Sequence, residues 1–260
     1  MKPIVVVGSV NIDFSIRVAA LPRPHETILG GDLTTAMGGK GLNQAAACAR
    51  LGLETHLVAA VGADAFADQA LEHLKARGVV THHVHRLHGA TGAASICVAD
   101  DGANMIVVAP GANGHLRPRH IEQAEALIRD AAAVIVQMET PPETVKAALE
   151  TARRHAVLSV LNPAPADARA LVLAPLADLM TPNEIELERL TGVAGQGDAA
   201  VASCRPGQGV QRRARGHGEV VAVVPVPVDR PGHRAAEGRV GLGRPDRAAM
   251  GQPGQAVERA

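Results

Sequence analysis

The stretch that decides the fold of this chain reads Gly38-Gly39-Lys40-Gly41-Leu42-Asn43-Gln44-Ala45. Three glycines within four residues let the backbone bend tightly and approach a bound molecule closely. An alanine-rich run follows, from Ala45 to Leu51, and predicts a helix. The glycine turn therefore lies at a helix N-terminus, where we expect free backbone N–H groups that favour anions and polar oxygens. An ordinary turn that caps a helix would give the same short pattern.

On both sides of this turn, short apolar runs alternate with helical patterns. The predicted strands are Ile4–Val7, His56–Val61, Ala132–Gln137 and Val157–Leu161. The predicted helices are Asp64–Arg77, Pro118–Asp130, Glu143–His155 and a segment that opens at Asn183 and ends near Thr191. This alternation predicts an α/β fold, with a doubly wound, mainly parallel sheet that carries helices on both faces.

Residues 14–18 and 27–35 alternate weakly between apolar and polar and predict short strands. Within residues 93–109, two further strand segments flank Asp100-Asp101-Gly102, which is a hairpin signal. We expect these strands to lie off the main sheet as a small β lid. The predicted α/β domain, with this lid included, covers residues 1–203.

Composition excludes several classes of protein. The chain has 260 residues, no net charge and 47% hydrophobic residues, so nothing indicates nucleic acid or a membrane surface as a partner. Aromatic residues make up 1%, without Trp or Tyr, which argues against a base-stacking platform. The cysteines at 48, 97 and 204 are widely spaced, as is typical of a reducing compartment, and no apolar run approaches membrane length. We therefore expect a soluble, cytoplasmic protein.

Polar side chains gather at predicted strand ends and helix starts. In an open α/β sheet the carboxyl ends of the strands meet at one edge, which is the usual ligand site. Asn, Asp, Lys and Glu together donate and accept hydrogen bonds, which suits a polyhydroxylated ligand. A solvated turn and a capped helix start are the structural alternatives for the first and last groups. The four groups are Asn11 with Asp13, Gly39 with Lys40 and Asn43, Glu139 alone, and Asn183 with Glu186.

The spacing of the glycine turn carries more information than its glycines. Gly-Gly-Lys-Gly-x-Asn-x-Ala, followed by Gly52 and Gly62, resembles the first signature of the ribokinase-like (PfkB) carbohydrate kinases. The segments Ser9–Asp13, Gln137–Pro141, Leu161–Pro165 and Thr181–Glu186 are also similar to this family, and to its ribokinase branch in particular. The resemblance implies a sugar site made of Asn11, Asp13, Gly39, Lys40, Gly41, Asn43 and Glu139. It also implies that Asn183 faces the phosphates of ATP and that Glu186 organises Mg²⁺ through water.

The activity that this resemblance implies is transfer of the γ-phosphoryl group of ATP to the primary (5-) hydroxyl of D-ribose. The implied cofactors are ATP and Mg²⁺, with a monovalent cation such as K⁺ as a further cofactor of the family. A homodimer through the lid strands is an implied assembly. Two other hypotheses stay open: a non-catalytic sugar-binding protein, and a kinase of another sugar or of a nucleoside.

The resemblance covers roughly residues 3–202 and then stops. The family places a Gly-Ala-Gly-Asp or Ala-Ala-Gly-Asp helix start near its C-terminus, and its Asp is the catalytic base. Neither motif occurs in this chain, so no catalytic residue can be identified, and the Thr-Leu-Gly-x-x-Gly nucleotide element is absent as well. We therefore predict little or no kinase activity for the chain as written.

Residues 204–260 differ in character from the rest of the chain. They contain no Lys or Ile and one Leu, Leu242, a composition that predicts a poorly ordered region. Within them only Val220–Val228 is predicted as a strand, and Asp229 is the candidate residue for the cation site. We hypothesise that this region is read out of frame and that the chain ends early.

Overall fold

The computed structural model describes residues 1–192, 211–214 and 220–225. Met1–Val228 forms one compact unit, and the second unit, Asp229–Ala260, lies entirely outside the described residues. The predicted boundary at residue 203 and the predicted disorder of 204–260 therefore stay predictions. Cys204 and Asp229 also lie outside the described part of the chain.

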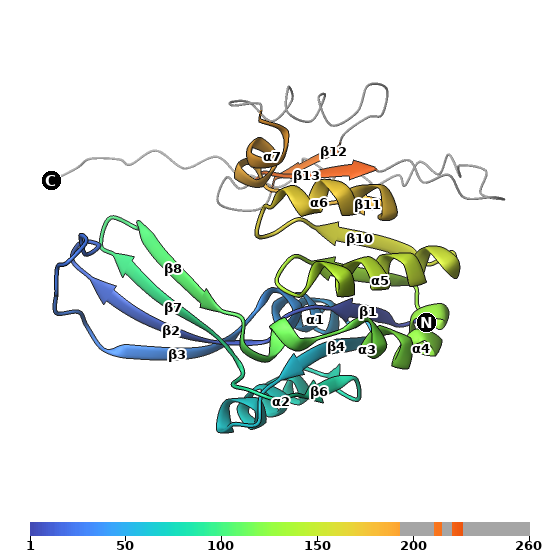
Figure 1. Cartoon of the computed structure of the whole chain (residues 1–260), viewed down its shortest axis with the longest axis horizontal. Helices are drawn as coiled ribbons and strands as arrows, with labels where there is room; N and C mark the ends of the chain where they lie inside the picture. Colours follow the sequence, from blue (N-terminus) through green and yellow to red (C-terminus); the bar gives the residue numbers. More distant parts are fainter. Residues whose placement is uncertain (193–210, 215–219, 226–260) are drawn as a thin grey trace, which may run out of the picture. The chain divides into compact units, whose positions relative to one another are not determined.

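A nine-stranded sheet forms the centre of the first unit (Figure 1). Its strands are β1 (Ile4–Val7), β4 (Thr55–Val61), β5 (Val79–Val80), β6 (Val84–Arg86), β9 (Ala133–Gln137), β10 (Leu158–Asn162), β11 (Leu179–Met180), β12 (Gln211–Ala214) and β13 (Val220–Pro225). The order is β12-β13-β11-β10-β9-β1-β4-β5, with β6 beside β4. All neighbours from β11 to β5 are parallel, whereas β13 and β12 add antiparallel pairs at one edge. The predicted mainly parallel sheet is confirmed.

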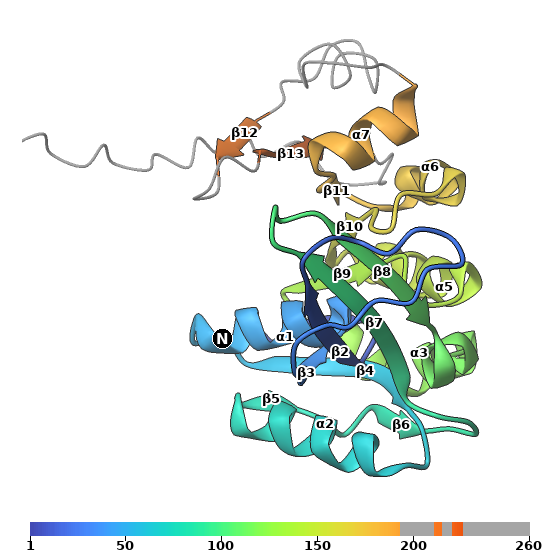
Figure 2. The same cartoon turned by 90° about the vertical axis from the view of Figure 1, so that its left-hand side faces the viewer.

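The sheet carries helices on both faces, as predicted. They are α1 (Lys40–Arg50), α2 (Ala65–Ala76), α3 (Pro118–Gln123), α4 (Glu125–Asp130), α5 (Pro142–Arg154), α6 (Ala168–Leu173) and α7 (Glu184–Thr191), with 3-10 turns η1 (Gly111–His115) and η2 (Ala174–Leu176). Figure 2 shows α1 and α5 on opposite sides of the sheet. Among the described residues, no helix is both long enough and apolar enough to span a membrane.

Successive residues of the central strands pack into different cores because strand side chains alternate between the two faces. Val6 of β1 lies in the core that Leu42 of α1 and Leu74 of α2 complete. Val5 and Val7 lie instead in the core that contains Leu149 of α5. A strand buried on both faces therefore reads as a continuous apolar run, which is why Ile4–Val7 could be recognised in the sequence.

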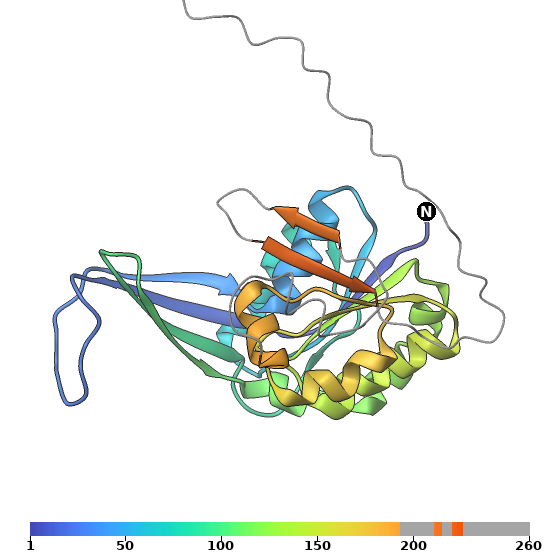
Figure 3. The same ribbon diagram turned by 90° about the horizontal axis from the view of Figure 1, so that it is seen from above.

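The lid is a separate four-stranded sheet with the order β3-β2-β7-β8. Its strands are β2 (Asn11–Val18), β3 (Leu33–Gly38), β7 (Gly92–Ala99) and β8 (Asn104–Ala109). Figures 1 and 3 show these strands extending away from the helices that cover the main sheet. Strands at 14–18 and 93–109 are confirmed as parts of this sheet.

The predicted strand at 27–35 is wrong in its position, since β3 begins only at Leu33 and continues to Gly38. Pro22, Pro24 and two glycines interrupt the preceding segment, and His25 has a positive φ of 68°. This irregular backbone forms the loop between β2 and β3.

The prediction of a single strand after residue 203 is also wrong. Val220–Pro225 does form β13, but Gln211–Ala214 forms β12 and pairs with it in antiparallel register. The segment Gln211–Ala214 has no apolar alternation. Its strand conformation depends on hydrogen bonds to a neighbour, which a local pattern does not reveal.

The helix after the glycine turn begins earlier than predicted, at Lys40 instead of Ala45. Gly39 is its N-cap residue, with φ 92° and ψ 138°, a conformation that favours glycine. A glycine within a helix costs about 1 kcal/mol relative to alanine, so Gly41 locally disfavours a helix here. Residues at the ends of other strands accept hydrogen bonds from the first turn of α1, which compensates for this cost. These residues form the candidate site.

Candidate functional site

The first turn of α1 is capped by groups from two other strand ends. The N–H of Lys40 donates to Oε2 of Glu139 at 3.1 Å. The N–H groups of Gly41 and Leu42 donate to the hydroxyl and the carbonyl oxygen of Ser9, at 3.4 and 2.9 Å. We expected these N–H groups to be free for a ligand, and the structure corrects that expectation. The positive end of the helix dipole instead favours the Glu139 carboxylate.

Glu139 joins three parts of the chain at one point. Its Oε2 accepts a hydrogen bond of 2.5 Å from the Ser9 hydroxyl, in addition to the one from Lys40. Its Oε1 lies 3.9 Å from Nζ of Lys40, and the Lys40 side chain is 37% exposed. A solvent-exposed ion pair contributes little stability, so this pair matters for where it places its charged groups. It places a donor and an acceptor side by side at the sheet edge.

Asp13 lies beside this pair with an unused acceptor group. Its carboxylate occupies the space over Gly38 of β3, where the Cβ of any other residue would collide with it. Burial, and after it the negative charge of Glu139, raises the pKa of the Asp13 carboxyl above its ordinary value. Among the described residues it accepts no hydrogen bond. Asp13, Lys40 and Glu139 therefore converge, as predicted from the topology of the sheet.

Asn11 is fixed by a residue that the sequence analysis missed. The Asn113 amide, in η1, donates to Oδ1 of Asn11 at 2.8 Å and to the carbonyl of Val10 at 3.0 Å. Its own Oδ1 accepts from the N–H of Val10 at 2.9 Å. Asn11 and Asn113 are 3% and 1% exposed, so these bonds lie in the interior. The bond from Asn113 uses one of the two acceptor positions of Asn11 Oδ1, and the amide N–H groups of Asn11 are the donors that it can offer a ligand.

Asn113 follows the lid strand β8 in a Gly-Ala-Asn-Gly turn that carries no apolar pattern. Its closeness to Asn11, more than a hundred residues away, depends on the path of the chain through the lid. The available signal was a polar residue in a short turn between two predicted elements, and that signal is common.

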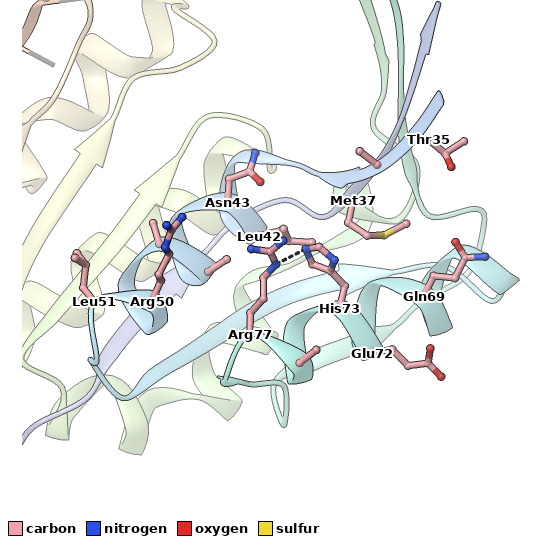
Figure 4. Close-up of a pocket in the computed structure, with 14 residues that line it drawn as sticks. Thr35, Met37, Leu42, Asn43, Arg50, Leu51, Gln69, Glu72, His73 and Arg77 are labelled. Carbon is pink, nitrogen blue, oxygen red and sulfur yellow. Dashed lines mark hydrogen bonds between the residues drawn. The ribbon is translucent and has the colours of Figure 1, made fainter. Parts of the chain in front are cut away.

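Asn43 is placed differently from the other predicted sugar ligands. It is exposed, and it lines a cavity of about 1060 Å³ between α1, β3 and α2 (Figure 4). Asp13, Lys40 and Glu139 do not line this cavity. The part of Asn43 in sugar binding therefore stays a prediction.

Asn183 and Glu186 form a reciprocal cap at the start of α7. The Asn183 side chain accepts from the N–H of Glu186 at 2.7 Å, and Oε2 of Glu186 accepts from the N–H of Asn183 at 2.9 Å. Oε1 of Glu186 accepts from the Asn183 amide at 3.1 Å. This is the helix-start interpretation that the sequence left open. No hydrogen bond or ion pair joins this pair to Asp13, Lys40 or Glu139 among the described residues. Asn183 and Glu139 follow strands β11 and β9 of the parallel sheet, whereas Asp13 lies within β2 and Lys40 follows β3 of the lid.

The histidines after α2 form a row of rings with one histidine of α3. The ring centroids of His85 and His120 are 4.6 Å apart, and those of His82 and His83 are 5.1 Å apart. Burial and neighbouring positive charges lower the pKa of His83, His85 and His120. Within the part of the chain that the structure describes, no three His, Cys, Asp or Glu side chains have a metal-binding arrangement.

The fold and the site together define a class of protein. A doubly wound sheet with charged and amide side chains at the carboxyl ends of its strands, and a lid beside them, is the arrangement of an α/β protein that takes a small polar ligand. Residues 1–214 match the model of the pfkB family carbohydrate kinases. The chain belongs to this family.

Individual relatives agree with the family match. The chain is 40% identical over 193 residues to the ribokinase of Haemophilus influenzae, which covers 74% of this chain and 63% of that protein. It is 35% identical over 193 residues to the deoxyribokinase of Salmonella typhi, over 73% of this chain and 63% of the relative. The chain therefore spans less than two thirds of the length of these curated relatives.

A solved structure shows the same architecture. The ribokinase of Arabidopsis thaliana, complexed with ribose and ATP, superposes with a TM-score of 0.70 at 32% identity. The match covers 78% of this chain and 68% of that one. The ribokinase-like fold predicted from the sequence is thereby confirmed.

Proposed function

We propose that this chain binds D-ribose at the site formed by Asn11, Asp13, Lys40 and Glu139. The observation that carries the proposal is the convergence of one cation and two carboxylates at the carboxyl edge of the sheet, where Asp13 accepts no hydrogen bond from the residues that the structure describes. Each sugar hydroxyl both donates and accepts, so it matches this set, and each unmatched buried group would cost roughly 1–3 kcal/mol. A similar protein of known structure holds ribose and ATP, which supports the ligand class.

The reaction that the family resemblance implies for this site is phosphoryl transfer from ATP to the primary hydroxyl of the bound sugar. When bound, Mg-ATP supplies the phosphoryl group and the charge that stabilises its transfer. Asn183 would face the phosphates, and Glu186 would hold Mg²⁺ through water. Each Glu186 oxygen already accepts a bond from Asn183, but a carboxylate has about four acceptor positions, so room for a metal-bound water is left.

For this chain we propose ribose binding with little or no phosphoryl transfer. Asp13, Lys40 and Glu139 orient the sugar, and none of them is the base that the family uses. The family motif that carries that base is absent from the sequence. Sequencing the DNA for codons 200–260 tests the hypothesis of a shifted frame, and an uninterrupted frame with these codons would contradict it.

Two measurements on the full chain separate binding from catalysis. Titration calorimetry with ribose and no nucleotide should give saturable binding, whereas coupled detection of ADP with ribose and Mg-ATP should give little or no turnover. Robust turnover would refute the loss of catalysis and leave the sugar site in place. Absence of ribose binding would refute the proposed function itself.

A kinase site for another sugar is the second candidate, and the deoxyribokinase relative favours it. Ribose and deoxyribose differ by one hydroxyl. A site that hydrogen-bonds this hydroxyl rejects the analogue without it, because its own polar groups are left unpaired. Competition between the two sugars in the calorimeter discriminates the candidates, with ribose preferred under our proposal.

We also propose that two copies of the chain pair through the lid. The edge strand β8 is exposed along its whole length, and its exposed apolar residues are Met105, Ile106, Val107 and Val108. An exposed apolar edge strand is a template for pairing with a second strand. K⁺ is the further cofactor that the family resemblance implies, and we propose a cytoplasmic location from the wide spacing of the cysteines.

A further inference from the structure

The cavity between α1, β3 and α2 is separate from the proposed sugar site. Its volume is about 1060 Å³, at the upper end of what small-molecule pockets occupy. Its walls combine apolar and charged side chains. Met37 and Leu51 supply apolar surface, and Leu51 is 79% exposed although it is apolar.

Two guanidinium groups line this cavity from the C-terminal ends of two helices. Arg50 lies in the last turn of α1, and Arg77 is the C-cap residue of α2 (Figure 4). Neither lies within 4.0 Å of a carboxylate in the described part of the chain. Glu72 lines the same cavity, so two arginines against one carboxylate leave net positive charge.

His73 adds no charge to this wall. Nε of Arg77 donates to Nε2 of His73 at 2.7 Å, so this nitrogen carries a lone pair. Burial, and after it the charge of Arg77, lowers the pKa of His73 and keeps the ring neutral near pH 7. The same bond holds the Arg77 side chain against α2, as Figure 4 shows, and leaves its terminal N–H groups for another acceptor.

Cations at helix C-termini also interact with the helix dipole, and that interaction alone would explain one arginine at each end. It does not explain why both guanidiniums line one cavity beside exposed apolar surface. A guanidinium fork matches carboxylate and phosphate groups in particular.

From this arrangement we propose that the cavity is a binding site for a small organic anion, with a carboxylate or phosphate head and an apolar body. Arg50 and Arg77 bind the head, and the body lies against Met37 and Leu51. Glu72 at the same wall disfavours ligands with more than one strongly charged head, because like charges repel.

A ligand in this cavity would contact the strand that supports Asp13. Met37 lines the cavity and pairs with Ile12, and Ala36 lines it and pairs with Asp13. The next residues, Gly38 to Lys40, lead directly into the sugar site. We therefore expect the anion to change the affinity for ribose, an effect that rests on the proposed function, whereas anion binding itself does not.

The binding test uses the full chain and four probes. Naphthyl phosphate and naphthoate carry the two heads on an apolar body, naphthol is the body without a charge, and inorganic phosphate is the head without a body. We expect at least one naphthyl anion to bind saturably at one site per chain, more tightly than naphthol and inorganic phosphate. Equal binding of naphthol or of inorganic phosphate, or no binding of either anion, would overturn the proposal.

Matched arginine variants locate the bound anion. The double variant Arg50→Gln with Arg77→Gln should weaken binding of the anion at least tenfold, since it removes two charge-assisted contacts. Arg189→Gln is the control, because Arg189 is also a cation in the last turn of a helix, α7, but does not line the cavity. Unchanged binding in the double variant, or equal weakening in the control, would place the anion elsewhere and overturn the proposal.

The coupling is tested by titrating ribose with and without saturating anion. We expect the ribose affinity to change at least threefold, and the anion affinity to change by the same factor when ribose is present. Binding of both ligands with no mutual effect would overturn the coupling and leave the anion site in place. Failure of ribose to bind would overturn the proposed function, which the first two experiments do not depend on.

Discussion

At the scale of single residues, Glu139 combines two roles that are usually separate. One oxygen caps the helix α1 and accepts from the Ser9 hydroxyl, while the other faces Lys40. The structural role fixes the side chain, and the fixed side chain then presents its other oxygen to Lys40. A site in which the ligand groups are already held by the fold loses little entropy when a sugar binds.

The contributions of Asp13 to ribose binding and to the stability of the fold can be measured separately. Asp13→Asn should weaken ribose binding roughly ten- to hundredfold, because hydrogen bonds to a charged acceptor are lost. The same change should leave the unfolding temperature equal or higher, since a carboxylate that burial and Glu139 disfavour is removed. Calorimetric titration and thermal unfolding measure the two effects.

The pH dependence of this prediction follows from the raised pKa of Asp13. The folded state holds the Asp13 proton more strongly than the unfolded state, so the wild type loses stability as the pH rises from 3.8 through the folded-state pKa. The stability of Asp13→Asn relative to the wild type should rise across that pH window, and the two proteins should be equally stable below it. Asp32→Asn, at an exposed acid before β3, is the control. An Asn variant less stable than the wild type at neutral pH would contradict this account.

Asn113 is expected to position Asn11 without touching the sugar. Asn113→Ala leaves the Val10 backbone groups and Oδ1 of Asn11 without their partner, at a cost of roughly 1–3 kcal/mol for each group that stays buried. We expect both the ribose affinity and the free energy of unfolding to fall. Thr144→Val removes a buried bond to the Leu116 carbonyl away from the site and should lower stability alone. Equal effects of the two variants on ribose affinity would argue against the positioning role.

At the scale of secondary-structure elements, the boundaries that the sequence missed are those that depend on distant contacts. Ile4–Val7 could be predicted because burial on both faces leaves a continuous apolar run. The start of α1 could not, since its first N–H groups are capped by Ser9 and Glu139, far away in the sequence. Likewise the predicted helix Pro118–Asp130 divides at Ala124 into α3 and α4, although its apolar spacing continues across the break.

In the candidate site, too, some features could be predicted from the sequence and others depend on distant contacts. Sheet topology was enough to predict that Asp13, Lys40 and Glu139 meet, because each follows or flanks a strand end. The clamp by Asn113 and the cap between Asn183 and Glu186 depend on side-chain geometry. Neither the choice of partner atoms nor the location of Asn43 in the cavity between α1, β3 and α2 follows from the spacing of residues along the chain.

The start of α2, like that of α1, is held by a residue that is distant in the sequence. Asp64 caps the helix by accepting from the N–H of Ala67, and it also accepts from the N–H and hydroxyl of Thr91, next to β7 of the lid. Asp64→Ala should lower the free energy of unfolding by about 1–2 kcal/mol, as measured by urea denaturation. Asp167→Ala, at the N-cap of α6, is the matched control without a lid contact and should cost less.

The acid dependence of the Asp64 contribution has a definite sign. Burial alone would raise the pKa of Asp64, but the hydrogen bonds from Thr91 and Ala67 outweigh it and lower the pKa below 3.8. The stabilisation by Asp64 is therefore complete above 3.8 and is lost as the pH falls through the folded-state pKa. This assignment would be contradicted if Asp64→Ala lowered the free energy of unfolding by the same amount at neutral pH and at strongly acid pH.

At the scale of the whole molecule, the exposed edge of the lid predicts the state of association. Val107 of β8 is 64% exposed, so a lysine there is compatible with the folded chain but not with pairing of two edges. We expect Val107→Lys to convert a dimer into a monomer in light scattering coupled to gel filtration. Val172→Lys changes an equally apolar, exposed residue of α6 and should leave the dimer intact. A wild type that is monomeric at all concentrations would refute pairing through the lid.

The central claim is that one polyol pocket unites the end of the first strand, the glycine turn and the carboxylate after β9. The most direct test is titration of the full chain with ribose in a calorimeter, carried out in parallel on Glu139→Gln. The account predicts saturable binding of one ribose per chain to the wild type and at least tenfold weaker binding to the variant. No saturable heat with the wild type, or equal affinity in the two proteins, would contradict it.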